Sequence, residues 1–201
     1  NNGAGVSAGQ PGAPAVIDIE NTSTPDTIPV QLNTIQHLPS CGAYSVITCS
    51  SADPGVFVVN PLSGTGRTGT ACAGVAFTFT STGDGLGTYN VTWSGTITLA
   101  GPNGATNGLD KCLIDFTVDV VGAPDVDASG VTPGLQTRPS ATTTGTGSNL
   151  TEAVGFGTTL VTVNKASPGI STSATAGPLP AGSQISDTAT VTGGLNPTGT
   201  V

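Results

Sequence analysis

Apolar and polar residues alternate along much of the chain, as they do in β-strands that bury one face. The alternation is strongest between residues 71 and 122, at Val75, Phe77, Phe79, Ile114, Phe116, Val118 and Val120. Shorter alternating runs occupy residues 15–20, 30–38, 44–49, 56–60, 158–164, 170–174 and 185–191. No stretch indicates a helix of useful length. We therefore predict an all-β protein whose core is an antiparallel sheet built from residues 71–122.

Turn-forming residues separate these runs and divide the chain into units. Asp84-Gly85 and Asn107-Gly108 suit turns that need a positive φ, and Pro54-Gly55 interrupts the strand pattern. Short strands at such intervals are typical of sandwiches, so we predict a β-sandwich over residues 15–122. The other predicted units are a loose polar leader, a long connection with short strands, and the start of a second β unit, at residues 1–14, 123–165 and 166–201.

The composition indicates an exported protein and excludes several partners. Only 8% of the 201 residues are charged, the net charge is −8, and there are 30 glycines and 15 prolines. The four basic residues are scattered, at Arg67, Lys111, Arg138 and Lys165. They cannot form the cation cluster that nucleic acids require, and no apolar run is long enough to span a bilayer. Because the chain begins without Met and stops where a further strand should begin, we expect a processed, secreted protein and a piece of a longer chain.

Four cysteines permit three disulfide connectivities, and their spacing matches no zinc site. We favour Cys41–Cys49, which would close a local loop, and Cys72–Cys112, which would join two core strands. Paired cysteines indicate an oxidising compartment, in agreement with an extracellular or cell-surface location.

One stretch has the spacing of a calcium-binding loop. Asp125, Asp127 and Ser129 alternate and are followed by Gly130, an arrangement that can wrap oxygen ligands around Ca²⁺. Gln136 stands where a bidentate Glu would complete the loop, and the alternative interpretation is a polar turn. We expect no cofactor, and Ca²⁺ is the one ion that the pattern leaves open.

The remaining candidates for chemistry do not predict an enzyme. His37 is the single histidine, and no G-x-S-x-G motif accompanies it, so we interpret it as an ordinary strand or loop residue. Asp115 and Asp119 alternate with the apolar face of their strand and should point to solvent. N-glycosylation sequons begin at Asn21, Asn90 and Asn149, and we expect them to stay unmodified in a bacterial protein.

The end of the chain resembles a known family. The stretches 167–176 (SPGISTSATA), 185–194 (ISDTATVTGG) and 196–201 (NPTGTV) resemble bacterial Ig-like surface repeats of exported, often actinobacterial, proteins. The stretches 44–49, 70–74 and 112–120 resemble the β-domain that often precedes such repeats. The resemblance implies an antiparallel Ig-like β-sandwich followed by a partial second Ig-like unit. It implies surface display, adhesion or assembly, and no chemistry.

Two functional hypotheses follow. The first is a non-enzymatic extracellular structural protein, a stalk or filament subunit that assembles through β-strand pairing between chains. Its partners would be other copies of itself or cell-surface components. The alternative is an adhesin-type binding module that recognises a carbohydrate or a host surface through residues 123–157. A hydrolase ranks third because no constellation of residues supports it.

Overall fold

The computed structural model describes residues 5–22, 28–39, 56–85, 87–102, 108–122, 136–137, 139–147, 150–158, 161–164, 169–175 and 177–192. In these ranges all the helices and strands of the structure are β-strands, and none is a helix. The strands are β1 Val6–Ser7, β2 Ala13–Glu20, β3 Val30–Leu38, β4 Phe57–Gly66, β5 Ala76–Ser81, β6 Tyr89–Trp93, β7 Thr98–Leu99, β8 Lys111–Val120, β9 Gln136–Thr137, β10 Ser140–Gly147, β11 Leu150–Thr158, β12 Val161–Asn164, β13 Gly169–Ala174 and β14 Asp187–Thr192. The prediction of an all-β protein is confirmed.

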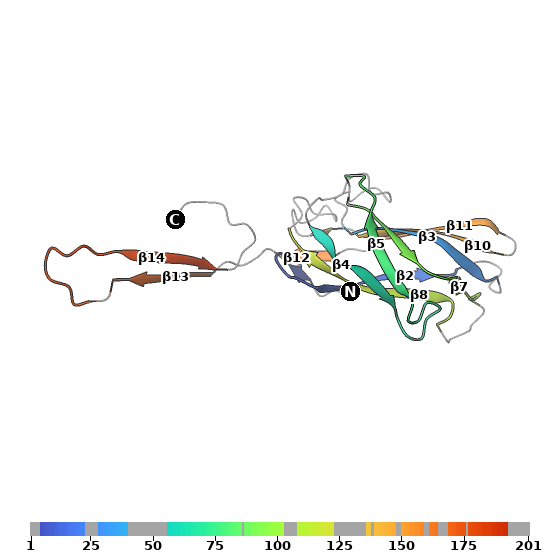
Figure 1. Cartoon of the computed structure of the whole chain (residues 1–201), viewed down its shortest axis with the longest axis horizontal. Helices are drawn as coiled ribbons and strands as arrows, with labels where there is room; N and C mark the ends of the chain where they lie inside the picture. The colour runs from blue at the N-terminus through green and yellow to red at the C-terminus, as the bar shows by residue number, and fades with distance from the viewer. Residues whose placement is uncertain are drawn as a thin grey trace.

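Nine strands form one sheet, which we call the main sheet (Figure 1). Its order is β11-β10-β3-β6-β5-β4-β8-β2, and β7 also pairs with β3. All of its pairs are antiparallel, as predicted. Hairpin neighbours such as β4–β5 are local, whereas β2–β8 and β3–β10 join segments far apart in the sequence. These long-range pairs bring both halves of the chain into one core.

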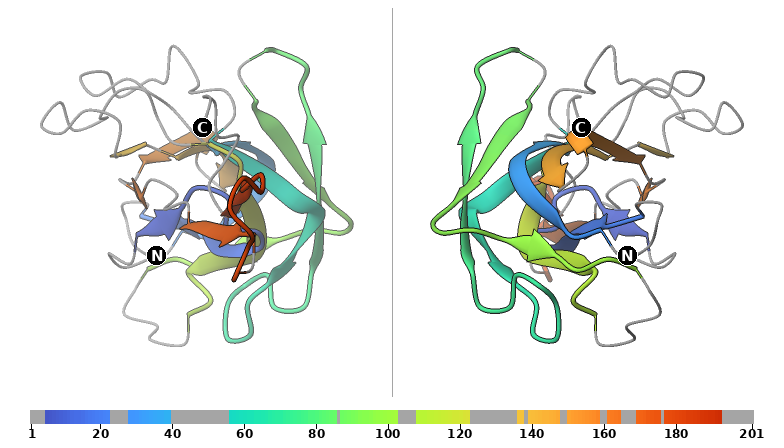
Figure 2. Two further views of the ribbon diagram at one scale, coloured as in Figure 1. Left: turned by 90° about the vertical axis from the view of Figure 1, so that its left-hand side faces the viewer. Right: turned by 90° about the vertical axis from the view of Figure 1, so that its right-hand side faces the viewer.

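The main sheet is strongly curled. The rings of His37 in β3 and Phe116 in β8 have centroids 5.2 Å apart, although three strands separate β3 from β8 along the sheet. In a flat sheet, four strand spacings would separate them by roughly 19 Å. Figure 2, which looks along the long axis, shows the strands curving round a common interior. The largest fully buried side chains include Phe77, Phe79, Ile35, Ile97, Leu99 and Ile114.

Strand β8 shows how the sequence pattern produces this core. Its residues alternate strictly between buried and half-buried positions from Lys111 to Val120. The buried set is Cys112, Ile114, Phe116, Val118 and Val120. Because successive side chains of a strand point to opposite faces, the buried apolar set covers the interior, and the other set, which is polar apart from Leu113, faces outward. The predicted alternation in this strand is therefore confirmed.

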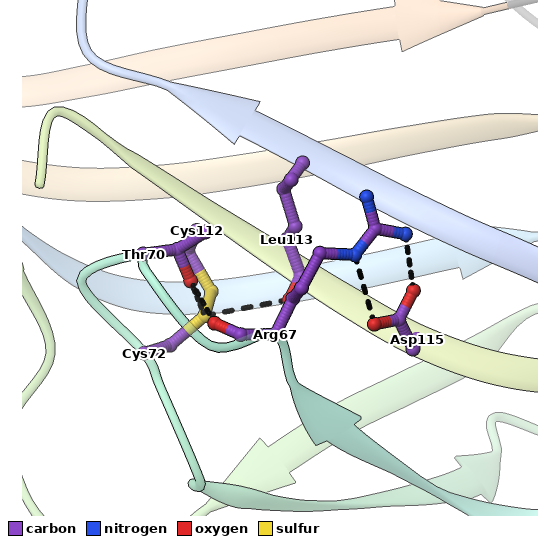
Figure 3. The surroundings of a disulfide bond; sticks show 6 residues. All are labelled: Arg67, Thr70, Cys72, Cys112, Leu113 and Asp115. Atoms are coloured by element: carbon purple, nitrogen blue, oxygen red, sulfur yellow. Dashed lines mark hydrogen bonds and ion pairs between the residues drawn. A yellow bond between two sulfur atoms is a disulfide. The ribbon is translucent and has the colours of Figure 1, made fainter. Parts of the chain in front are cut away.

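A disulfide joins Cys72 to Cys112 in the interior (Figure 3). Cys72 lies in the loop between β4 and β5, Cys112 lies near the start of β8, and both are fully buried. The Arg67 amide donates to the Leu113 carbonyl (2.8 Å), which holds the loop against β8. This is the pairing that the sequence favours, whereas Cys41 and Cys49 lie outside the described residues. The bond closes 40 residues of sequence, which on the loop-entropy model stabilises the fold by about 4 kcal/mol.

The predicted connection over residues 123–165 contains longer strands than the sequence indicates. β10 and β11 have eight and nine residues, and both belong to the main sheet. Strand β10 (SATTTGTG) has no large apolar residue, so its alternation is invisible in the sequence. It pairs along its whole length with β3, and its threonines suit a pleated strand. The main sheet therefore extends beyond the predicted 15–122 unit, to residue 158.

Two smaller sheets complete the described structure. One is three-stranded, with order β1-β12-β9, in which β1 and β12 run parallel. The other is the β13–β14 hairpin, which lies apart from the main sheet in Figure 1. The hairpin occupies the region in which the sequence predicts the start of a second unit.

Candidate functional site

The residues that the sequence singles out for chemistry lie in separate places. His37 is in the core, while Asp115 and Asp119 are on the outer face of β8. Residues Asp125, Asp127 and Ser129 lie outside the described part of the chain, so the Ca²⁺ site stays a prediction. Among the described residues, no group of three or more His, Cys, Asp or Glu side chains could hold a metal ion.

His37 is a buried residue of the core. Its Nδ1 lies 2.9 Å from the Ser140 carbonyl oxygen, so Nδ1 carries the proton and donates it to this acceptor. The edge of the ring packs against Phe116 and Phe79. Burial penalises the charged imidazolium and lowers the His37 pKa to about 4, even though the bond to Ser140 opposes this shift. With one nitrogen bound to the backbone and the ring among aromatic side chains, His37 contributes to packing.

The outward carboxylates of β8 are held by structural partners. Asp115 accepts two hydrogen bonds from the guanidinium of Arg67, at 3.0 and 2.5 Å, as Figure 3 shows. These bonds lower the Asp115 pKa. Asp119 accepts from the Asn60 side-chain amide (2.6 Å) and from the Gly12 backbone amide (2.9 Å), and its pKa is lowered by the same kind of contact. Each carboxylate fastens a neighbouring segment to β8, and the two do not share a ligand.

Two of the three sequons fall on described residues, and their side chains differ in exposure. Asn21 is buried, and its amide nitrogen donates to the carbonyls of Ile28 and Ala100, each at 2.8 Å. A glycan cannot be attached to that nitrogen in the folded chain. Asn90 is exposed in β6, and its Oδ1 accepts from the Gln36 side chain. Asn149 lies outside the described residues.

Among the described elements, the β13–β14 hairpin stands out because its surface is exposed to solvent. Every residue of both strands is exposed. Its large apolar side chains are among the most exposed in the protein: Ile170 is 65% exposed, and Ile185, next to β14, is 73% exposed. A pair of strands buries too little to be stable alone, and normally packs against a further layer. The exposed hairpin is therefore our candidate functional site.

The two faces of the hairpin differ in chemistry. Ile170 is paired with Val191, Thr172 with Ala189, and Ala174 with Asp187, so these six side chains lie on one face, which is apolar around Ile170 and Val191 and acidic at Asp187. The opposite face holds hydroxyl-bearing pairs, namely Ser171–Thr190 and Ser173–Thr188. Such alternation is typical of a strand pair that buries one face, here the face that carries Ile170 and Val191. In the described structure that face is exposed.

The register also shows which backbone groups point away from the hairpin. The Thr175 amide donates to the Ser186 carbonyl at 2.9 Å, so these two residues form a hydrogen-bonded pair. Hydrogen-bonded and non-hydrogen-bonded pairs alternate along an antiparallel ladder. The amides and carbonyls of Ile170, Thr172 and Ala174 therefore point outward from β13, and those of Asp187, Ala189 and Val191 point outward from β14. Both strands thus have a free edge, meaning an edge without a strand partner among the described residues.

The main sheet also ends in two free edges, at β2 and β11. The Asn21 amide donates to the Asp110 carbonyl, which extends the β2–β8 ladder by one hydrogen-bonded pair. By the same alternation, the outward positions of β2 are the even-numbered residues Pro14, Val16, Asp18 and Glu20. Pro14 has no amide hydrogen, and Asp18 and Glu20 are acidic. Such residues protect an edge strand from further pairing.

Sequence reasoning found the two runs of the hairpin but missed their pairing and their exposure. The usable signal was present: two runs rich in Thr, Ser and small residues flank a segment that contains Pro178, Pro180 and Gly182. The alternation around Ile170 and Val191 predicted a buried face. A period of two does not indicate whether a second layer covers that face, so the exposure was missed.

Two general findings complete the picture. No helix in the described part of the chain is long and apolar enough to cross a membrane. Comparison with known proteins finds no matching family model, no similar curated protein and no similar solved structure. The functional argument therefore depends on the chain's own geometry, and the resemblance to Ig-like surface repeats stays a prediction.

Proposed function

We propose that the protein is a non-enzymatic extracellular structural protein, a stalk or filament subunit whose copies join through β-strand pairing. One observation carries the proposal: the β13–β14 hairpin is exposed on both faces and presents free edges on both strands. Strand addition from a neighbouring chain would satisfy the outward amides and carbonyls and would enlarge a sheet that is marginal with two strands.

The apolar pair of the hairpin supports the same proposal. Ile170 and Val191 face each other across the ladder and are 65% and 42% exposed. Burying an aliphatic side chain of this size contributes roughly 2 kcal/mol. Such a gain is available to a contact that covers the first face of the hairpin, and it would add to the backbone hydrogen bonds.

The main sheet supports the extracellular part of the proposal. Its buried Cys72–Cys112 disulfide is of a kind that persists in oxidising compartments. Two of the four basic side chains lie beside acidic ones: Arg67 binds Asp115, and Lys111 lies 3.9 Å from Glu20. A rigid, weakly charged body with a projecting hairpin suits a structural subunit.

Assembly of the oxidised full chain tests the proposal. Light scattering over a range of concentrations, followed by electron microscopy, should reveal oligomers that lengthen with concentration. Limited proteolysis should cleave residues 169–192 in dilute protein and spare them in assemblies. Monodisperse monomers at every concentration, with the hairpin cleaved throughout, would overturn the proposal.

The alternative adhesin function receives less support from the described residues. Carbohydrate sites commonly present aromatic faces, but the Trp93 ring packs against Phe77, with centroids 5.9 Å apart. Tyr89 is buried and packs against Phe79. A glycan array with the intact chain addresses this alternative directly, and a reproducible hit on monomeric protein would favour it over assembly.

A further inference from the structure

We infer that β13 of one copy adds to the free edge of β11 in a second copy, and that repetition of this contact produces an open filament. The inference rests on the proposed function and deepens it by naming the two edges that meet. Two edges could donate a strand, those of β13 and β14, and two could receive it, those of β2 and β11.

The donor edge is assigned by charge. The outward backbone positions of β13 are Ile170, Thr172 and Ala174, and β13 contains no ionisable residue. The outward positions of β14 begin with Asp187, which is acidic. In a protein of net charge −8, a contact between copies is favoured where neither side adds a negative charge. This condition selects β13.

The acceptor edge is assigned by its chemistry. Of the four outward positions of β2, Pro14 lacks an amide hydrogen, and Asp18 and Glu20 place carboxylates on the edge. Strand β11 (LTEAVGFGT) has nine residues, no proline, and Glu152 as its one ionisable residue. Its ladder with β10 shifts register near Gly145, where Thr151 and Glu152 stand opposite Thr146 alone. From Ala153 to Thr158 the ladder is regular, and this stretch contains no proline and no ionisable residue. This regular stretch has six residues, as β13 has, so the whole donor strand can pair.

The two edges that meet lie on different parts of the molecule. The hairpin projects beyond the main sheet, whereas β11 lies at one edge of that sheet in the body of the molecule (Figure 1). Donor and acceptor are thus different surfaces of the same chain, and a contact between unlike surfaces is heterologous. Heterologous contacts form filaments when the rotation does not close. Each filament would then retain one unused β13 at one end and one unused β11 at the other.

A pair of proline variants tests the donor edge. Thr172 and Ala189 are cross-strand partners, and their amides point outward on opposite sides of the hairpin. Thr172→Pro removes an outward amide from β13, and Ala189→Pro removes one from β14, while both leave the inner ladder its hydrogen bonds. We expect Thr172→Pro to weaken association at least tenfold in sedimentation velocity. Ala189→Pro should change association less than twofold.

A complementation experiment tests the acceptor edge. Ala153→Pro and Val154→Pro remove neighbouring amides of β11, and because successive amides alternate between edges, one of the two lies on the free edge. A proline on the free edge leaves the hydrogen bonds between β10 and β11 intact, so this variant is identified by a main-sheet melting temperature equal to that of the wild type. It should not assemble alone. Mixed with the Thr172→Pro chain, it should form dimers and nothing longer, because one intact β13 meets one intact β11.

The outcomes separate the inference from the function on which it rests. If wild-type chains assemble but Ala189→Pro abolishes assembly and Thr172→Pro does not, the donor is β14 and the inference is wrong. If neither β11 variant affects assembly, or if the mixture stays monomeric, the acceptor assignment is wrong. In all of these cases strand pairing between copies would still stand, whereas wild-type protein that never assembles overturns both.

Discussion

In the main sheet, β8 buries every second side chain, whereas β13 and β14 of the hairpin expose every one. Both regions carry the same alternation of apolar and polar residues. The main sheet curls until β3 faces β8, so that its inner surface becomes the second layer that its own apolar side chains need. The hairpin has two strands and cannot curl onto itself. Alternation therefore indicates which face of a strand is apolar and gains from burial. The number of strands in the sheet decides whether the sheet can curl and bury that face itself.

The two regions also differ in what holds them together. The main sheet combines a buried disulfide, an aromatic cluster around Phe79 and Phe116, and a buried His37. The hairpin has its ladder and a few hydroxyl contacts near Thr175 and Ser186. We expect changes in the first region to alter folding stability, and changes in the second to alter association. Trp93, the single tryptophan, lies in β6 and reports the unfolding of the main sheet.

The largest expected effect is the loss of the disulfide. Replacing both cysteines, Cys72→Ala with Cys112→Ala, should lower the free energy of unfolding by about 4 kcal/mol, since the unfolded chain regains the freedom of a 40-residue loop. Urea denaturation followed by Trp93 fluorescence measures this change. The double substitution is preferable to a reductant because it changes this pair alone. A loss below about 1 kcal/mol would show that curling and packing hold the main sheet without the bond.

A second variant tests the tight packing of the loop against the disulfide. A Cβ at Gly66 would lie 1.7 Å from the Cys72 carbonyl oxygen, so Gly66→Ala forces the backbone apart. We expect a loss of about 3 kcal/mol in the same denaturation experiment. Gly69→Ala is the matched control in this loop, because its Cβ would meet no atom within 4 Å and its φ of +78° alone is unfavourable. That control should cost about 1 kcal/mol, and equal losses would contradict the packing argument.

Acid should weaken the main sheet through His37. The folded state holds the His37 pKa at about 4, below the ordinary histidine value of 6.5, so the unfolded chain binds the proton first. This contribution to stability is fully present above about pH 6.5 and is lost progressively as the pH falls towards 4, by about 3 kcal/mol in total. Denaturation at pH 7 and pH 4.5 measures it, with His37→Gln as the control that lacks this titration. Asp115 and Asp119, whose pKa values are lowered from 3.8, lose their contribution in a more acidic range.

The smallest effect on stability should come from the hairpin. Ile170→Ala removes a largely exposed side chain and should change the unfolding of the main sheet by less than about 0.5 kcal/mol. The same substitution at the buried Ile114 should cost about 2–5 kcal/mol. In sedimentation velocity, Ile170→Ala should weaken association several-fold. Equal stability losses at the two positions would show that the hairpin is packed in solution and would remove the contrast between the regions.

The strands that could be predicted from the sequence are those whose own residues show a pattern, such as apolar alternation or a cysteine. β8 was predicted because Ile114, Phe116 and Val118 alternate with polar residues, and its disulfide to Cys72 was the favoured one among the connectivities that four cysteines permit. β10 and β11 were missed as long strands, because a strand of Thr and Gly is specified by the neighbour to which it binds. The pairing of β13 with β14 was missed for a related reason, since neither run contains a residue that identifies the other.

The position of His37 shows most clearly why some features could be predicted from the sequence and others could not. Counted from the buried Val30 and Leu32, strict alternation places residue 37 on the outer face of β3. The ladder with β10 shifts register between Thr144 and Gly145, so Asn33 and Thr34 are both exposed and the phase reverses. After this bulge Ile35 and His37 point inward. In the sequence of β3, Ile35 is out of phase with Val30 and Leu32, but Leu38 is in phase with them. These residues alone therefore do not locate the bulge, which depends on how two strands fit together.

By itself, the sequence determined that the chain forms strands and which side chains of β8 face inward, because a period of two is a local property. The tertiary structure decided that the main sheet curls, that His37 is enclosed, and that the hairpin projects with its free edges exposed. Those features depend on which strand lies beside which, and pairing between distant segments is set by the packing of the whole chain.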